Sequence, residues 1–225
     1  MKISICARIM HIYSRPSPTE IVRSLELFGD VLTIVDDVGR GPWATAKRCW
    51  LSGADSSKTH TLVIQDDAMV ANGAAEQMVL ALEARPNDVV SFFYHNHEGA
   101  QKAGGAPFIE FPISNWGVCL AMPSSMARNM VAWNDENISP SVQQDDLRVL
   151  HYACNHGLKI CATNPSLCEH RPEFASTVSP RGNNREFLAS RLYRGEHINW
   201  ALPAYQAPGD TRAFLISRQH QRATG

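Results

Sequence analysis

The sequence predicts a single α/β domain in which a mostly parallel sheet is flanked by helices, followed by an irregular, arginine-rich C-terminal tail. Two observations predict this class. Short apolar runs alternate with amphipathic runs of helical period up to about residue 172, and Gly, Pro and Asn residues separate them. Beyond that point Ser, Pro, Gly and Arg replace the alternation. We therefore place an α/β domain at 1–172 and a tail or lid, packing on the same domain, at 173–225.

Local sequence signals predict each of the N-terminal elements. Residues 3–9 form an apolar run that predicts the first strand. Ser17 is then predicted as the N-cap of a helix, with Glu20 completing a capping box, and Gly29 ends that helix. The apolar run at 31–35 predicts the second strand, which ends at two acids.

The remaining elements follow from the same two patterns. A Gly-Pro-Trp turn at 41–43 precedes a helix, and a polar, glycine-rich stretch at 95–105 is predicted as a loop. Further helices are predicted at 44–51, 72–84, 123–133 and 145–156, and further strands at 61–65, 89–94, 116–122 and 158–162.

Composition and charge narrow the function classes. The 225 residues are 44% hydrophobic and 19% charged, which suits a globular chain with a substantial core. The net charge of −1 excludes a uniformly basic nucleic-acid-binding protein. From residue 171 onward, however, eight arginines face four acids, and this basic segment indicates contact with the phosphates of a nucleotide or a polymer.

The cysteines and the N-terminus indicate a cytoplasmic protein. The six cysteines lie mostly in apolar runs without the paired spacing of zinc sites, so we expect buried free thiols in a reducing compartment. The first apolar run is too short for a signal peptide, and no run of about 18 apolar residues predicts a membrane span. The oligomeric state stays open.

Two adjacent carboxylates, Asp66 and Asp67, directly follow the strand predicted at 61–65. Open α/β sheets bind ligands at the carboxyl ends of their strands. Mg²⁺ and Mn²⁺ are usually held there by one or two carboxylates together with substrate phosphates and water. The pair therefore predicts a metal site, although two acids after a strand also suit a solvated turn.

Two later features strengthen this prediction. Asp145 and Asp146 begin a predicted helix, where one of them can act as a general base, although acids in a first turn are also favoured by the helix dipole. His170 follows the last predicted strand and can complete the metal site, or it is an ordinary hydrogen-bonded histidine.

Other candidates have equally good structural explanations. Asp36 and Asp37 end the second strand, where an acid can contact a base or ribose or simply stabilise a turn. A histidine pair can bind a ligand, but polar histidines are more often solvated. Three tryptophans can stack on a base or a sugar, but aromatic residues are more often core residues. Arginines of the tail can close over a diphosphate. These residues are His95, His97, Trp43, Trp116, Trp200, Arg181, Arg185, Arg191 and Arg194.

Taken together, residues 3–171 resemble nucleotide-sugar-dependent glycosyltransferases of the GT-A fold, and the chain is similar to small bacteriophage-encoded glycosyltransferase-like proteins. The resemblance is carried by His11 and Arg15, by Gly41-Pro42-Trp43 with Lys47 and Arg48, by Gln65-Asp66-Asp67, by Asn115-Trp116-Gly117, by Gln144-Asp145-Asp146 and by Pro165-Ser166-Leu167-Cys168-Glu169-His170.

The resemblance implies a role for each of these positions. Asp67 and His170 would be the metal ligands, Asp146 the base, and Asp145 would stand where the family often has Glu. Donor-binding positions would be Arg15, Asp36, Asp37, Trp43, Lys47, Arg48, Gln65 and Asp66, and the acceptor side would include Asn115, Trp116 and Gly117. Gln65 departs from the family, which usually has an acid there, so the triplet offers the metal one carboxylate fewer.

These roles imply a hexosyl- or pentosyltransferase that uses a nucleotide-diphosphate sugar and Mn²⁺ or Mg²⁺. The acceptor hydroxyl is open between a hydroxymethylated pyrimidine in phage DNA and a glycan or protein. Two other classes stay open: a nucleotidyltransferase, although residues 6–11 lack the glycine-rich segment that this class normally carries, and a relative that binds a nucleotide or DNA without turnover.

Overall fold

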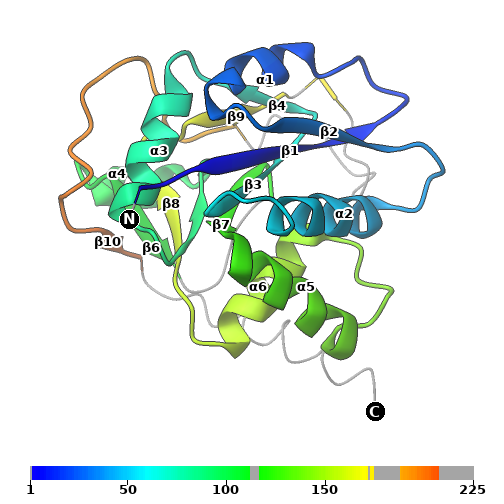
Figure 1. The fold of residues 1–225 in the computed structure, drawn as a ribbon. Coiled ribbons are helices and arrows are strands. Elements are labelled where there is room, and N and C mark those ends of the chain that lie inside the picture. The colour runs from blue at the N-terminus through cyan, green and yellow to red at the C-terminus, as the bar shows by residue number, and fades with distance from the viewer. Residues whose placement is uncertain (1, 112–116, 172, 175–187, 208–225) are drawn as a thin grey trace.

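The computed structural model describes residues 2–111, 117–171, 173–174 and 188–207. Its framework is a large sheet (Figure 1). The strands of this sheet are β1 (Ile5–Ile12), β2 (Val31–Asp36), β3 (His60–Gln65), β5 (Val89–Ser91), β6 (Phe108–Phe111), β7 (Cys119–Pro123), β8 (Ile160–Thr163) and β10 (Tyr205–Gln206). They lie side by side in the order β10-β6-β8-β5-β7-β3-β1-β2.

The sheet is mixed, with most strands pointing one way. Strands β1, β2, β3, β5 and β8 run in one direction, and β6, β7 and β10 run in the other. The reversed strand β7 lies between β3 and β5 and pairs with both. The predicted mostly parallel α/β sheet is therefore confirmed, and the carboxyl ends of β1, β2, β3, β5 and β8 share one edge.

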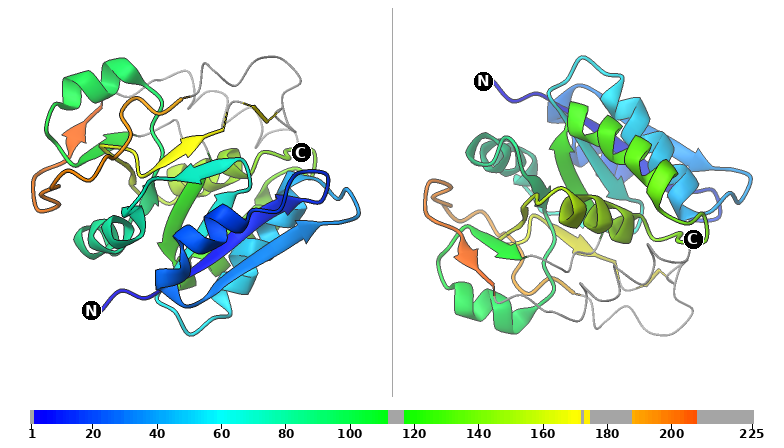
Figure 2. Two further views of the ribbon diagram at one scale, coloured as in Figure 1. Left: turned by 90° about the horizontal axis from the view of Figure 1, so that it is seen from above. Right: turned by 90° about the horizontal axis from the view of Figure 1, so that it is seen from below.

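Helices cover both faces of this sheet. They are α1 (Thr19–Ser24), α2 (Pro42–Ala54), α3 (Ala74–Ala84), α4 (His97–Ala103), α5 (Ser124–Asn137) and α6 (Asp145–Asn155). Figure 2 shows α2, α5 and α6 grouped over one face, and their apolar residues form one core cluster. The other face packs against α1 and α3 through a second cluster. Alternation along β3 feeds both cores, because Leu62 and Ile64 enter one and Val63 the other.

A second, two-stranded sheet was missing from the sequence prediction. It consists of β4 (Ala68–Val70) and β9 (Cys168–His170), which run antiparallel with Ala68 opposite His170. Strands of three residues carry too little alternation to be recognised, and these two are about a hundred residues apart in sequence. The pairing places the residue before β4 beside the end of β9.

Three local predictions were wrong. Ser17 does not cap α1, because Pro18 occupies the N-cap position without a side-chain cap, and α1 gives way to a 3₁₀ turn at Glu26–Phe28 before Gly29. Residues 42–43 belong to α2 rather than to a turn, since proline is tolerated in the first helical turn. The predicted loop 95–105 contains α4, whose N-terminus is capped by Asn96 accepting from the N–H of Gly99.

The described part of the tail, residues 188–207, packs on the same cores. Tyr193 and Trp200 are buried, and the indole N–H of Trp200 donates to Gln77 of α3 at 3.0 Å. Strand β10 extends the sheet beyond β6. The domain boundary near residue 172 stays a prediction, and Arg181 and Arg185 lie outside the described residues.

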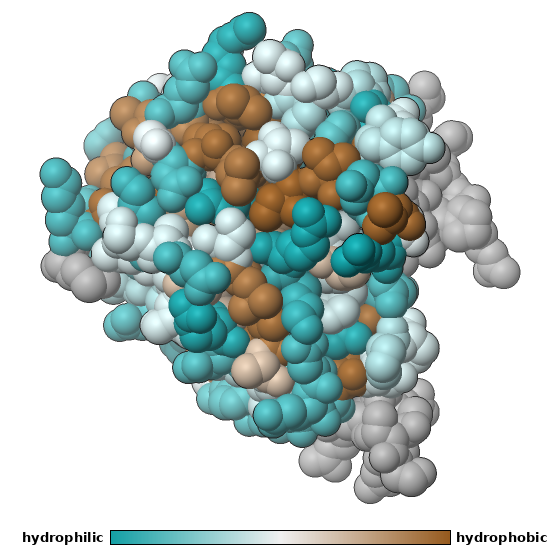
Figure 3. Space-filling model, turned by 45° about the vertical axis from the view of Figure 1, so that its right-hand side comes forward, coloured by the Kyte–Doolittle hydropathy of each residue, from teal (hydrophilic) through white to brown (hydrophobic). Residues whose placement is uncertain are grey.

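The surface completes this description. Figure 3 shows apolar areas interrupted by polar side chains on the face that it presents. Large exposed apolar side chains include Leu27, Leu32 and Val38. In the described residues, no helix combines the length and the apolar character that crossing a membrane requires.

Candidate active site

Asp66 joins the ends of β1 and β3. Its Oδ2 accepts from the backbone N–H of Ile12 at 2.8 Å and lies 2.9 Å from Nδ1 of His11, which must donate because a carboxylate oxygen accepts. Its Oδ1 accepts from the guanidinium of Arg15. The side chain of Asp66 is buried, so these donors satisfy a carboxylate that water scarcely reaches.

Asp67 and His170 are brought together by the small sheet. Asp67 directly precedes β4, His170 ends β9, and the backbone N–H of Arg171 donates to the carbonyl of Asp67 at 2.7 Å. As a result, Nε2 of His170 lies 3.5 Å from Oδ2 of Asp67. The other oxygen, Oδ1 of Asp67, and Nδ1 of His170 are buried without a hydrogen-bond partner among the described residues. Unsatisfied buried groups destabilise a fold, and a ligand at this position would remove that cost.

The residues at this position fit a divalent cation. A carboxylate and an imidazole are common ligands of divalent transition metals such as Mn²⁺, and Oδ1 of Asp67 accepts no hydrogen bond from the part of the chain that the structure describes. Among the described residues, no group of three or more His, Cys, Asp and Glu side chains could hold a metal alone. A cation here would thus have two protein ligands, and substrate phosphate and water would supply the others.

The second acidic pair begins α6 and faces Gly117. A Cβ atom on Gly117 would lie 3.1 Å from Oδ2 of Asp145, 3.2 Å from Cβ of Asp146 and 3.3 Å from Nε2 of Gln65. The backbone N–H of Gln65 also donates to the carbonyl of Val118 at 3.0 Å. The reversed strand β7 therefore brings the start of α6 beside the end of β3, and three other predicted site residues meet at Gly117.

The two carboxyl groups of this pair differ in acidity. Burial raises the pKa of Asp145 to about 8, and the negative charges of Asp146 and Asp67 add to this rise. Burial also raises the pKa of Asp146, to about 6, while the backbone N–H groups of Leu147 and Gly117 oppose the rise. The N–H of Leu147 donates to Oδ1 of Asp146 at 2.8 Å. Asp145 therefore keeps its proton to a higher pH than Asp146, and the pair titrates as one coupled unit.

Arg148 fixes the segment that leads into α6. It is almost fully buried and donates to the carbonyls of Val142 and Ser139, both at 2.8 Å. Its guanidinium also lies over the ring of Trp43, 4.5 Å from the centroid. Trp43 is therefore a core residue that connects α2 to this segment. Sequence analysis missed Arg148, since an arginine in an amphipathic helix normally indicates a solvated face.

The other predicted donor-binding residues make structural contacts. The carboxylate of Asp36 accepts from the backbone N–H groups of Arg40 and Gly41, which stabilises a turn, and Asp37 is exposed. On α2, Lys47 pairs with Asp135 and Arg48 donates to the carbonyl of Val35. A donor-binding role for Asp36, Asp37, Trp43, Lys47 and Arg48 stays a prediction. Asn115 and Trp116 lie outside the described residues.

Two residues near the site were not given a role from the sequence. His11 carried part of the resemblance, and its contact with Asp66 follows from the register that places Met10 opposite Gln65. Glu169 accepts through Oε1 from the backbone N–H groups of His170 and Ala189, so it ties the described tail to β9. Glu169 belongs to the motif that carries the resemblance, but no sequence signal pointed to its contact with Ala189, which is twenty residues away in an irregular segment.

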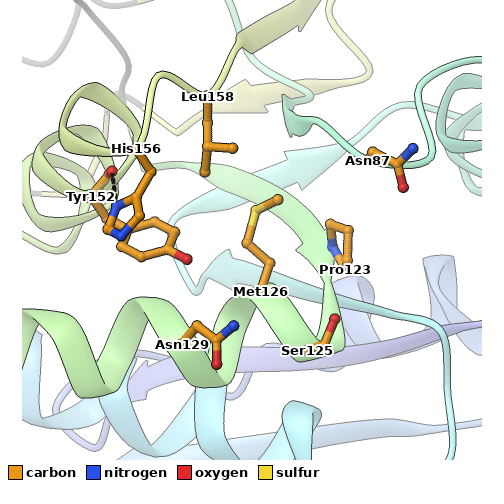
Figure 4. Close-up of a pocket in the computed structure, with 8 residues that line it drawn as sticks. All are labelled: Asn87, Pro123, Ser125, Met126, Asn129, Tyr152, His156 and Leu158. Atoms are coloured by element: carbon orange, nitrogen blue, oxygen red, sulfur yellow. Dashed lines mark hydrogen bonds between the residues drawn. The ribbon is translucent and has the colours of Figure 1, made fainter.

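A separate groove of about 410 Å³ lies between α5 and α6 (Figure 4). It is lined by Asn87, Pro123, Ser125, Met126, Asn129, Tyr152, His156 and Leu158. Pro123 ends the reversed strand β7, so the groove lies at the opposite edge of the sheet from Asp67. None of its lining residues is a carboxylate or a predicted site residue, and we place the candidate site at Asp67 and Asp146.

Comparisons with known proteins give only distant likenesses. No family model matches the chain, and no curated protein matches it. A solved structure described as A197 from STIV has a TM-score of 0.43 at 13% identity, covering 86% of this chain and 100% of that one. Mannose-1-phosphate geranyltransferase from Thermus thermophilus has a TM-score of 0.39 at 11% identity, covering 72% of this chain and 74% of that one. These values are too low to bear on the activity of this chain.

Proposed function

We propose that this chain is a GT-A-like glycosyltransferase that moves a sugar from a nucleotide-diphosphate sugar to an acceptor hydroxyl, with Mn²⁺ or Mg²⁺ at Asp67 and His170. The observation that carries the proposal is the arrangement around Gly117. There, two acids with raised pKa values, Asp145 and Asp146, stand side by side and close to the end of β3, which continues into Asp67.

The chemistry of these groups suits glycosyl transfer. A divalent cation, when bound, would neutralise the negative charge that builds on the leaving diphosphate. Arg15 can add hydrogen bonds to the same phosphate oxygens, since a guanidinium binds phosphate well. Asp146 can take the proton of the acceptor hydroxyl through a carboxylate oxygen, because its pKa lies close to neutral pH. Asp145 keeps its proton and can donate a hydrogen bond to a substrate oxygen.

The first test is thermal unfolding with a panel of nucleoside diphosphates and nucleotide sugars, each with and without Mn²⁺. A ligand that binds only the folded chain raises the melting temperature. We expect a manganese-dependent rise with one nucleotide, and we expect Asp67→Ala to abolish it. No rise with any nucleotide would refute a sugar-nucleotide enzyme and favour screening of other ligand classes.

Turnover separates an enzyme from a relative that only binds. Release of nucleoside diphosphate with a suitable acceptor is expected for the wild-type chain and is expected to fall by about 100-fold or more in Asp146→Asn, since general-base catalysis contributes about 10²–10⁴. Unchanged turnover in that variant would show that the base assignment is wrong. Nucleotide binding without turnover on any acceptor would favour the non-catalytic alternative. Release of pyrophosphate would instead favour a nucleotidyltransferase.

The acceptor divides into two testable classes. A hydroxymethylated pyrimidine in DNA would require phosphate contacts, for which the basic C-terminal segment is the candidate, and binding would weaken steeply with salt. If the acceptor is a glycan or a protein, we expect no salt-sensitive binding of duplex DNA. Binding of hydroxymethylated duplexes at several salt concentrations decides between these two.

A further inference from the structure

Arg15 lies between the two carboxylates of the predicted metal-binding pair. Its Nη1 contacts Oδ1 of Asp66 and lies 3.1 Å from Oδ2 of Asp67. That same Oδ2 is the atom 3.5 Å from Nε2 of His170. The oxygen best placed for sharing a cation between Asp67 and His170 is thus already held in an ion pair.

This ion pair is shielded from water. The side chain of Arg15 is 12% exposed and that of Asp67 7%. The guanidinium also lies against the ring of Phe174, at 5.5 Å from its centroid. Charges in such surroundings interact more strongly than in water, and salt screens them poorly. A divalent cation at Asp67 and the guanidinium of Arg15 would therefore repel each other strongly at one carboxylate.

The neighbouring contacts allow Arg15 to release Asp67 alone. Asp66 keeps the donors His11 and Ile12 whatever Arg15 does, so it remains a fixed anchor for the guanidinium. Asp67, in contrast, has one oxygen without a partner among the described residues, and Arg15 and His170 lie beside the other. A small rotation of Arg15 about its Asp66 contact would open Asp67 without undoing the ends of β1 and β3.

We propose that Arg15 couples cation binding to donor binding. Without a donor, Arg15 holds Asp67 and keeps the affinity for divalent cations low. The diphosphate of an incoming donor offers the guanidinium a doubly charged partner, draws it away from Asp67, and so frees that carboxylate for the cation. This inference rests on the proposed function, because it takes a nucleotide-diphosphate sugar as the donor.

Linkage makes the coupling reciprocal. If a nucleoside diphosphate raises the affinity for Mn²⁺ by some factor, Mn²⁺ must raise the affinity for that nucleotide by the same factor. The coupling would leave the carboxylates neutralised by Arg15 in the resting chain, and it would open the cation site only when a phosphate is present.

Arg171 provides a matched control. Its backbone N–H donates to the carbonyl of Asp67, but its side chain pairs with Glu20 of α1. Arg171→Met thus removes one positive charge from the same neighbourhood without removing a partner of either carboxylate. Arg15→Met removes a charge of the same size together with the contact to Asp67.

The experiment measures Mn²⁺ affinity by calorimetry in the wild-type chain, Arg15→Met and Arg171→Met, with and without the nucleoside diphosphate that gives the largest thermal shift. Without nucleotide, we expect Arg15→Met to bind Mn²⁺ about tenfold more tightly than the wild type or better, and Arg171→Met to bind like the wild type. Adding nucleotide should tighten Mn²⁺ binding in the wild type and in Arg171→Met. In Arg15→Met this gain should be smaller, because phosphate still ligates the cation but no longer draws a guanidinium away from Asp67.

The inference would be overturned if Arg15→Met, without nucleotide, bound Mn²⁺ no more tightly than the wild type does. It would also be overturned if nucleotide tightened Mn²⁺ binding by Arg15→Met as much as it does in the wild type. In either case nucleotide binding by the wild type would leave the proposed function standing. Absence of nucleotide and Mn²⁺ binding in every chain would instead overturn the proposed function. If Arg15→Met does not fold, Arg15→Lys serves as the second variant. It keeps the charge but loses the planar fork, and we expect it to reduce the nucleotide-dependent gain.

Discussion

The carboxyl group of Asp145 is held in surroundings that favour its neutral form. Its pKa is raised to about 8, so the folded chain binds this proton more tightly than the unfolded chain, where the pKa is near 4. Stability from this proton is fully present below pH 4 and is lost as the pH rises towards 8. Burying this carboxyl group therefore destabilises the fold near neutral pH.

Asp145→Asn should stabilise the folded chain most at high pH, where burial of the Asp145 carboxyl group is most destabilising. At pH 8 we expect a gain on the order of 2 kcal/mol, or a melting temperature higher by about 4–8 °C, and at pH 4 we expect little change. Thermal unfolding across this pH range measures both. Asp135→Asn, which removes an exposed carboxylate on α5, is the control and should show neither the gain nor its pH dependence. A loss of stability at pH 8 would contradict this account of Asp145.

The side chains around Gly117 leave little room for a methyl group. A methyl group there would press on Asp145, Asp146 and Gln65 at 3.1–3.3 Å, so all three would shift by a few tenths of an ångström. Gly117→Ala is expected to lower turnover by on the order of tenfold or more, because small displacements of reacting groups are costly, with only a modest loss of melting temperature. Gly105→Ala, at a position where a Cβ would meet no described atom within 4 Å, should leave both unchanged. Comparable turnover in the two variants would mean that Gly117 tolerates a side chain.

At the scale of single residues, the sequence indicated one pair of the candidate site and left other contacts unpredicted. Asp67 and His170 were expected to share a metal site, and the structure places Nε2 of His170 3.5 Å from Oδ2 of Asp67. A core position was the commoner expectation for Trp43, but its partner could not be predicted, because Arg148 is about a hundred positions away. Long-range contacts of this kind leave no local pattern in the sequence.

At the scale of elements, the start of α6 depends on a single buried arginine. Removing Arg148 would leave the carbonyls of Ser139 and Val142 without this donor and would open space beside Trp43. We expect Arg148→Met to lower stability by about 2–4 kcal/mol, because the lost hydrogen bonds to these carbonyls and the lost packing against Trp43 act together. Because this segment leads into Asp145 and Asp146, turnover should also fall.

Arg128→Met is the matched control, since Arg128 also donates to a carbonyl, that of Ala54, but from an exposed position on α5. Arg128→Met should lower the free energy of unfolding by less than about 1 kcal/mol. Urea unfolding of both variants gives the comparison, and equal losses would argue against a special role for Arg148.

The elements that the sequence predicted share one property. Each long strand or helix, such as β3 or α6, carries a periodic apolar pattern that local residues alone define. Strands β4 and β9 are three residues each and form by pairing with each other. Neither segment alone is long enough to show the alternation that predicts a strand. Helix α4 begins at an Asn cap within a polar, glycine-rich stretch, where composition argued for a loop.

At the scale of the molecule, the two cores and the site have separate tasks. The apolar clusters on the two faces of the sheet supply stability, and the described tail adds to it through Tyr193 and Trp200. The carboxyl edge of the sheet instead holds the buried carboxyl group of Asp145, whose raised pKa weakens stability at neutral pH. Such an exchange of stability for chemistry is typical of active sites.

The pH dependence of turnover tests whether the whole arrangement works as proposed. Asp146 must be ionised to accept a proton, so kcat/KM should rise with pH through about 6. Asp145 must keep its proton to donate a hydrogen bond, so kcat/KM should fall again as the pH passes about 8. The two limbs belong to the coupled pair. We expect Asp145→Asn to remove the upper limb and keep the lower one, because Asn donates a hydrogen bond at any pH. Nucleoside diphosphate release measured across the range that spans both pKa values gives the profile, and a rate that does not change with pH around the pKa of about 6 would exclude Asp146 as the base.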